Sequence, residues 1–256
     1  MIKNDAFPKE EKENDKDVIF GRNSVAEAIK SGRPLDSVMV ARGERSGSIP
    51  KIVADAKKVG IVIKEVDSKK LDFICGHNNH QGIAALGAVK EYSSIDDIFK
   101  TAEERNEEPF IIICDEIEDP HNLGAIIRTA EAAGAHGIII PKRRSASLSF
   151  TVAKTSAGAV EFMHVARVTN IPQTIEELKK RGVWVYCADM DGEPFYNSNL
   201  KGAIALVIGS EGNGVGRLVK EKCDVCLSMP MKGKINSLNA SVAAGILMYE
   251  VSRQRI

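Results

Sequence analysis

The chain has 256 residues, 43% of them hydrophobic and 27% charged, which is typical of a globular protein with one large or two modest domains. It has no run of about eighteen apolar residues and no apolar signal core, so we expect no membrane span and no export. The formal net charge is zero. This argues against a protein held to nucleic acid by bulk charge, although basic runs remain at 142–144 and at Lys232 and Lys234.

The five cysteines have no framework spacing, so we expect a protein of the reducing cytoplasm rather than a disulfide scaffold. Cys223 and Cys226 form a single pair with no second pair nearby. A zinc site of this type needs two such pairs, so we interpret Cys223 and Cys226 as structural and predict no metal site.

The first third of the chain divides into a tail and a small domain. Residues 1–16 are polar and mixed in charge, which predicts a disordered tail. Residues 17–90 show a compact α/β pattern of a length that suffices for an independent domain. Ser24 and Glu27 have the spacing of a capping box at the start of a helix. The remaining predicted elements are strands at 37–41, 61–66 and 83–89 and helices at 49–58 and 69–75.

Residues 91–108 are polar with a weak apolar stripe, and we interpret them as a linker that holds one helix. From 109 to 256 continuous apolar runs alternate with helical segments, which indicates a parallel sheet covered on both faces. In such a sheet the ligand is expected at the carboxyl ends of the strands. The predicted strands are 110–114, 135–140, 183–188, 204–208 and 225–227. The predicted helices are 123–133, 150–157, 172–181, 216–221 and 238–253.

The first polar segment at a predicted strand end is 115–128, which opens a helix. Asn122 suits the N-cap after Pro120, and we expect Arg128, six residues on, to project from a similar face. The helix is otherwise built for burial, so Arg128 needs a partner, for which a phosphate or carboxylate is the natural candidate. A capped helix with one surface arginine is the alternative.

The second segment, 209–216, has four glycines in eight residues directly after a predicted strand. Glycine lets the backbone approach a ligand closely. Val215 and Gly216 replace the last two residues of a Walker loop, and Arg217 replaces the third glycine of a dinucleotide fingerprint, so both are rejected. The segment is therefore a glycine-rich loop with one carboxylate, Glu211, or a plain tight turn.

The third segment, 227–243, leads from a short strand into a helix whose start carries Ser237, Asn239 and Ser241. Serine and asparagine are common helix caps. Only one cap position exists, so the spare polar groups are expected to face a ligand.

These three segments together resemble the motifs of the SpoU/TrmH family of RNA ribose 2′-O-methyltransferases, within the knotted SPOUT superfamily. The resemblance covers residues 109–256 through Asn122-x-Gly124-x3-Arg128, the loop 209–216, and Met229-Pro230 with the segment 237–243. The region 17–90 is similar to the family's small RNA-binding domain, which resembles a ribosomal-protein fold. It carries Phe20-Gly21-Arg22-Asn23 and His80-Gln81-Gly82. This layout resembles that of bacterial enzymes that methylate a guanosine of large-subunit ribosomal RNA.

The resemblance implies a deep trefoil knot in the C-terminal domain, S-adenosylmethionine as cofactor, and a homodimer packed through that domain. The helix at 238–253 could as easily be covered within one chain. The implied cofactor pocket is lined by Gly209, Met229 and Leu238, with Gly214 and Pro230 beside them. The implied catalytic residues are Asn122, Arg128, Glu211, Ser237 and Asn239. The candidate RNA contacts are Arg22, Asn23, His77, Asn78, His80, Gln81 and Arg128.

Three alternatives stay open at this point. The substrate could be transfer RNA rather than ribosomal RNA. The chain could be a non-catalytic RNA-binding protein, against which the intact set of implied catalytic residues argues. It could also be a nucleotide-dependent dehydrogenase, against which the broken glycine fingerprint argues.

Overall fold

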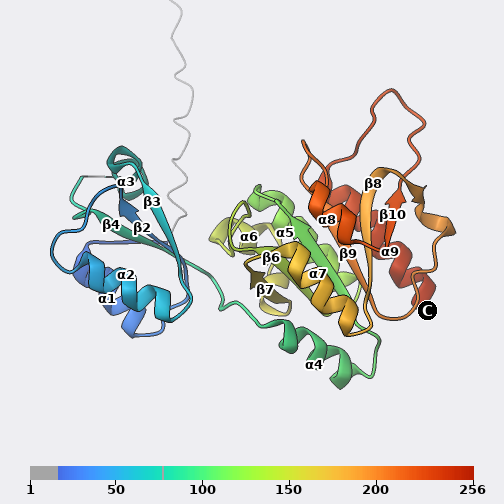
Figure 1. Ribbon diagram of the computed structural model, residues 1–256, viewed down its shortest axis with the longest axis horizontal. Helices are drawn as coiled ribbons and strands as arrows, with labels where there is room; N and C mark the ends of the chain where they lie inside the picture. Colours follow the sequence, from blue (N-terminus) through green and yellow to red (C-terminus); the bar gives the residue numbers. More distant parts are fainter. Residues whose placement is uncertain (1–16, 77) are drawn as a thin grey trace, which may run out of the picture.

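The computed structural model describes residues 17–76 and 78–256, which form two α/β domains joined by one connecting segment (Figure 1). The predicted disordered tail at 1–16 and the candidate RNA contact His77 lie outside the described residues. None of the helices in the described part of the chain is long and apolar enough to cross a membrane.

The N-terminal domain is a four-stranded sheet in the order β1-β4-β2-β3, with helices on both faces. Its elements are β1 (Val18–Phe20), α1 (Arg22–Lys30), β2 (Leu35–Ala41), α2 (Ile49–Lys58), β3 (Val62–Val66), α3 (Ser68–Cys75) and β4 (Ile83–Gly87). α1 and α2 cover one face, where Val25 and Ile52 pack in one apolar cluster with Val38. α3 covers the other face, where Leu71 packs with Met39.

The C-terminal domain is a six-stranded sheet in the order β10-β8-β9-β5-β6-β7, and all its strand pairs are parallel. Its strands are β5 (Phe110–Asp115), β6 (Gly137–Pro141), β7 (His164–Val168), β8 (Trp184–Pro194), β9 (Ile204–Gly209) and β10 (Val225–Ser228). Its helices, with α4 from the connecting segment, are α4 (Ile95–Arg105), α5 (Pro120–Ala132), α6 (Phe150–Thr155), α7 (Ile171–Lys180), α8 (Arg217–Lys222) and α9 (Ala240–Arg255).

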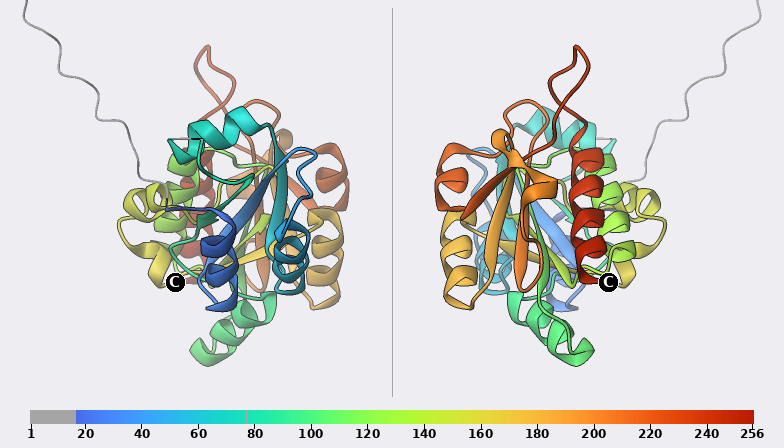
Figure 2. Two further views of the ribbon diagram at one scale, coloured as in Figure 1. Left: turned by 90° about the vertical axis from the view of Figure 1, so that its left-hand side faces the viewer. Right: turned by 90° about the vertical axis from the view of Figure 1, so that its right-hand side faces the viewer.

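The helices of this domain sit in two layers, one on each face of the sheet (Figure 2). α5, α6 and α9 bury apolar side chains such as Ile126, Val152 and Leu247 on one face. α4, α7 and α8 bury Ile98, Ile175 and others on the opposite face. Since β5 has apolar neighbours on both faces, every one of its residues is buried. The predicted doubly covered parallel sheet is therefore confirmed.

The sequence missed two strands and placed the cap of α1 wrongly. β1 has three residues and β7 contains a histidine and an arginine, so neither shows a continuous apolar run. The predicted capping box of Ser24 and Glu27 is wrong, because α1 begins at Arg22 with Gly21 at its N-cap, and Ser24 lies inside the helix. A capping box does form at α4, where Ser94 and Asp97 bond each other's backbone.

The segment between the domains lies along the edge of the C-terminal sheet. The Val89 amide donates to the Leu148 carbonyl at 2.9 Å, and the Ser93 amide donates to the Val165 carbonyl at 2.9 Å. Ser93 also forms a parallel bridge with Ala166 of β7. The connecting segment is therefore fixed beside the edge strand β7 by one bridge and two backbone hydrogen bonds.

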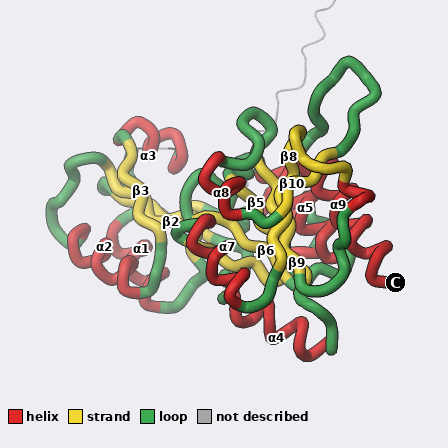
Figure 3. Tube along the Cα trace, turned by 45° about the vertical axis from the view of Figure 1, so that its right-hand side comes forward, coloured by secondary structure: helices red, strands yellow, loops and turns green. Residues whose placement is uncertain are grey.

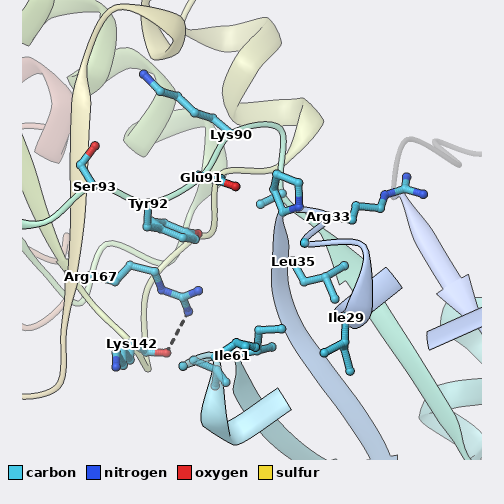
Figure 4. Close-up of a pocket in the computed structure, with 16 residues that line it drawn as sticks. Ile29, Arg33, Leu35, Ile61, Lys90, Glu91, Tyr92, Ser93, Lys142 and Arg167 are labelled. Atoms are coloured by element: carbon cyan, nitrogen blue, oxygen red, sulfur yellow. Dashed lines mark hydrogen bonds between the residues drawn. The ribbon is translucent and has the colours of Figure 1, made fainter. Parts of the chain in front are cut away.

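A buried polar cluster joins the two domains beside this segment, at a cavity of about 390 Å³ (Figure 4). Asp36 of β2 is 1% exposed, and its carboxylate lies 3.2 Å from the Arg167 guanidinium of β7. The Tyr92 hydroxyl donates to the same carboxylate at 3.4 Å, and the Arg167 guanidinium lies over the Tyr92 ring. Burial raises the pKa of Tyr92 to about 12, so this hydroxyl stays a neutral donor.

We predict that Arg167→Ala destabilises the protein and frees the two domains from each other. Among the described residues the substitution leaves the buried Asp36 carboxylate with Lys64, 3.5 Å away, as its only cation. Breaking a buried pair costs about 3 kcal/mol of unfolding free energy. Arg33→Ala is the matched control, because Arg33 lines the same cavity but its ion pair with Asp17 is half exposed. The loss of unfolding free energy in Arg33→Ala, measured by urea denaturation, should be about 1 kcal/mol or less. Equal losses in the two variants would contradict the prediction.

Candidate active site

The three polar segments meet at the carboxyl edge of the C-terminal sheet. Asp115 ends β5 and is paired in register with Gly209, which ends β9. β10 ends nearby at Ser228, and the long loop that follows it rises beyond the sheet before α9 begins (Figure 3). The parallel arrangement therefore brings residues from three distant parts of the sequence to one place.

Asn122 does not cap α5, contrary to the prediction from the sequence. The N-cap is Asp119, whose carboxylate accepts from the His121 amide at 2.8 Å, and Pro120 occupies the first turn. Asn122 therefore lies within the helix with its side chain unused by the cap. Its Nδ2 donates to Oε1 of Glu211 in the glycine-rich loop at 2.9 Å.

Asn239 completes this cluster from the third segment. Its Nδ2 donates to Oδ1 of Asn122 at 3.0 Å and also to Oε1 of Glu211. Its Oδ1 caps α9 by accepting from the amides of Ser241 and Val242. One asparagine thus both starts the last helix and ties the three segments together.

The loop 209–216 closes on itself in a way that requires glycine. The Gly214 amide donates to the Ser210 carbonyl at 2.8 Å, and the Ser210 amide donates back to Gly214 at 3.1 Å. A Cβ on Gly209 would lie 2.1 Å from the Gly214 carbonyl carbon, which is far inside any real contact. The glycine at 209 is therefore explained first by packing of the loop against its own backbone.

Asp115 is a residue that the analysis of the sequence missed. Its Oδ2 accepts from the Gly216 amide at 2.8 Å, which fastens the far end of the loop to β5. Burial raises the pKa of this carboxyl, while the bond from Gly216 lowers it. The only signal in the sequence was the position of Asp115 at the end of a buried strand.

A cavity of about 530 Å³ lies beside the cluster, within the range of about 300–1,000 Å³ for ligand sites. Ile208, Met229, Met231 and Leu238 give it apolar walls, and the main chain of 209–214 forms one side. Asp189, Asp191 and Glu211 line it with carboxylates. These groups fit S-adenosylmethionine, since its flat adenine suits apolar walls with backbone groups and its cationic centres suit carboxylates.

Most residues predicted for the cofactor pocket line this cavity. They are Gly209, Gly214, Met229 and Leu238, together with Glu211 and Ser237 from the predicted catalytic set. Pro230 is exposed and is not among the lining residues. Ser237 lies in the loop before α9, not in the first turn of that helix.

Arg128 is exposed on α5 and does not share a face with the buried Asn122. Six residues of helix turn the side chain by about 120° from its starting direction, so the prediction of a similar face is wrong. Among the described residues Arg128 has neither an ion pair nor a hydrogen bond, so its guanidinium is open to an added anion. It also needs no internal partner, since it is not buried.

The candidate RNA contacts of the N-terminal domain separate into two groups. Arg22 and Gln81 come together, with the Arg22 amide donating to the Gln81 side chain at 3.1 Å, and Asn23 is exposed beside them. His80 is 5% exposed, and both its ring nitrogens are engaged, by Asp72 at 3.0 Å and by the Gly82 amide at 3.0 Å. The structure therefore gives His80 a structural role rather than a place on the surface.

No group of three or more histidine, cysteine or acidic side chains within residues 17–76 and 78–256 is arranged to hold a metal ion. Cys226 lies across the β10–β8 pair from Cys187, with their Sγ atoms 3.0 Å apart. The Cys223 thiol donates to the Val219 carbonyl. Cys223 and Cys226 are both partly buried against the apolar cluster on the face of α4, α7 and α8.

Comparison with known families identifies the chain. Residues 109–249, more than half of the chain, match the SpoU rRNA methylase family. The chain belongs to this family. Residues 18–93 match the family described as RNA 2′-O ribose methyltransferase substrate binding. The enzyme class expected from the sequence, an RNA methyltransferase with the substrate-binding domain of RNA 2′-O ribose methyltransferases, is thereby confirmed.

Individual relatives agree with this assignment. The chain is 54% identical to the TrmH family tRNA/rRNA methyltransferase YacO of Bacillus subtilis, over 93% of this chain and 96% of that protein. It is 47% identical to a TrmH family tRNA/rRNA methyltransferase of Staphylococcus aureus, over the same shares. Its structure is similar to that of the SpoU methyltransferase AviRb from Streptomyces viridochromogenes in complex with AdoMet. That match has a TM-score of 0.59 and 23% identity, covers 94% of this chain and 90% of that chain, and agrees with the fold. The trefoil knot stays a prediction.

We predict that Gly209→Ala weakens S-adenosylmethionine binding by about tenfold or more, because overpacking of this size distorts the loop by 1 to 3 kcal/mol, roughly. Gly233→Ala is the control, since Gly233 lies in the loop before α9, does not line the cavity, and a Cβ there has no neighbour within 4 Å. Calorimetric titration of both variants with S-adenosylmethionine measures the difference. The explanation fails if the two alanine variants bind equally well.

Proposed function

We propose that this protein methylates the ribose 2′-hydroxyl of a guanosine in large-subunit ribosomal RNA. The observation that carries the choice of site is the hydrogen-bonded cluster of Asn122, Glu211 and Asn239 beside the cavity of about 530 Å³, which Glu211 lines. The resemblance of the whole two-domain layout to enzymes of that specificity supports the choice of RNA. Transfer RNA is the alternative substrate, and the names of the relatives include both RNA classes.

S-adenosylmethionine supplies a methyl group on a sulfonium that leaves as a neutral thioether. Gly209, Gly214, Met229 and Leu238 would hold it through main-chain groups and apolar packing. Pro230 would act only by shaping the chain after Met229, because its side chain does not line the cavity. Glu211 would face the positive charge of the cofactor while Asn122 and Asn239 keep its carboxylate in place.

The chain's own residues must also place the ribose and accept its proton. Ser237 lines the cavity and would bond the ribose. Arg128 is the family's base by resemblance, but a free guanidinium stays protonated far above neutral pH. We therefore assign to Arg128 a contact with the substrate phosphate. Through this contact Arg128 would either remove the proton jointly with the phosphate or chiefly orient the phosphate.

Residues 17–90 would bind the RNA, residues 91–108 would link the domains, and residues 109–256 would carry the reaction. Arg22, Asn23 and Gln81 are the proposed contacts of the first domain, and His80 would act indirectly by shaping its loop. The exposed stripe of Val242, Ile246 and Tyr249 on α9 supports a homodimer through the C-terminal domain. Leu247 of the same helix is already covered within the chain. We place the enzyme in the cytoplasm, with its RNA.

Mapping of ribose methylations in cells with and without the gene tests the proposed substrate. We expect a guanosine of large-subunit ribosomal RNA to be methylated at its ribose only in cells that have the gene, because the enzyme is the source of that methyl group. Resistance of the adjoining phosphodiester to alkaline cleavage measures each position. A methylation lost from transfer RNA instead would contradict the proposed RNA, and the loss of none would contradict the activity.

The role of Arg128 is tested by Arg128→Lys. We expect kcat to fall by about tenfold or more, because an ammonium cannot hold a phosphate through two parallel hydrogen bonds. Arg105→Lys is the control, since Arg105 is exposed on α4, on the far face of the sheet. Methyl transfer is measured across pH for both variants. Near-normal turnover of Arg128→Lys would rule out both the base and the two-bond anchor.

A further inference from the structure

Phe73 has the most exposed aromatic ring among the described residues, at 83% of its full accessibility. It lies on α3, whose Leu71, Ile74 and Cys75 pack against the N-terminal sheet. The apolar ring therefore points away from the core, where burial would have stabilised it. The ring is therefore available to a partner outside the chain.

The surroundings of Phe73 are polar and cationic. Lys69 and Lys70 lie one helical turn before it, so all three side chains share the outer face of α3. Neither lysine has a carboxylate partner within the described part of the chain. A ring of this size buries about 150–250 Å², whereas a stable protein interface needs about 800 Å² from each partner. A lone ring beside free cations therefore suits a nucleobase with its phosphates better than a protein surface.

A second aromatic ring lies on the same side of the domain. Along β1, Val18 belongs to the cluster under α3 and Ile19 to the cluster under α1 and α2. Alternation along the strand then directs Phe20 to the side of α3, and its ring is 41% exposed.

The loop that contains Asn78 and Gln81 is fastened to α3. Nε2 of the buried His80 bonds Oδ1 of Asp72, the residue next to Phe73, at 3.0 Å. The proposed RNA contacts Arg22 and Gln81 are therefore held at a fixed position relative to α3. Figures 1 and 2 show α3 on the same, upper side of the molecule as the loop that precedes α9, although the two lie toward opposite ends of its long axis.

We propose that Phe73 stacks on an unpaired base of the substrate RNA while Lys69 and Lys70 contact its neighbouring phosphates. This inference rests on the proposed function and names a binding site for that same substrate. Every base has a π-face, so stacking on Phe73 anchors the RNA without reading its sequence. RNA loops present the unstacked bases that such a site requires.

The test compares Phe73→Ala with Phe162→Ala. Phe162 is the matched control because its ring is 77% exposed, yet Gly158 and Ala159 stand one turn before it in place of lysines. The probe is total RNA from cells that lack the gene, in filter binding and in methyl transfer. We expect Phe73→Ala to raise Kd and KM for RNA by about fivefold to 100-fold, with unchanged S-adenosylmethionine binding. Phe162→Ala should match the wild type.

Two further variants separate stacking from other roles. In Phe73→Trp, affinity should be retained and RNA should quench the added indole beyond the quenching of Trp184 in the wild type. In the double variant Lys69→Ala/Lys70→Ala, the slope of log Kd against the logarithm of the salt concentration should decrease by about 0.7 for each lysine removed. Wild-type affinity for RNA in Phe73→Ala would overturn the inference. Equal losses of RNA affinity in Phe73→Ala and Phe162→Ala would also overturn it, as would self-association of the protein that depends on Phe73. If the wild type itself transfers no methyl group to either RNA class, the proposed function fails first.

Discussion

The parallel pairing of β5 with β9 is the constraint on which the site depends. Six aligned pairs run along two buried strands and end at Asp115 and Gly209. Because the register fixes both ends at one level, the Asp115 carboxylate reaches the Gly216 amide and secures the glycine-rich loop. A slip of one residue would turn Asp115 to the other face of the sheet and release the loop. The pairing of these buried strands therefore fixes the position of the loop that carries Glu211.

Asn239 is the second element on which the site depends, and its chemistry explains why asparagine stands there. Serine or aspartate would cap α9 equally well. Neither has an NH₂ group, so neither could donate to both Asn122 and Glu211 while its oxygen holds the helix. The start of α9 and the arrangement of the polar cluster are thus fixed by the two ends of a single amide.

Much of this architecture could be predicted from the sequence, and the exceptions have physical causes. Continuous apolar runs marked β5 and β9 because both faces of these strands are buried, whereas β7 lies at an edge and carries polar residues. The motif residues around Glu211 could be named, but not their partners, since hydrogen bonds between segments about 90 residues apart leave no local pattern. Asp119 and Asn122 have equal cap propensity, and Pro120 at the first helical position was the local signal that favoured Asp119.

The two domains are held together by polar rather than apolar contacts. The apolar clusters of the N-terminal domain contain no residue of the C-terminal sheet, so the hydrophobic effect does little to fix the angle between the domains. The pair of Asp36 and Arg167 is directional, and the bridge of Ser93 to Ala166 prevents the connecting segment from swinging. A substrate RNA that touches both domains is then bound at two sites of fixed separation. The second contact forms at the high effective concentration of a rigid link, which lets weak contacts on each domain add up to specific binding.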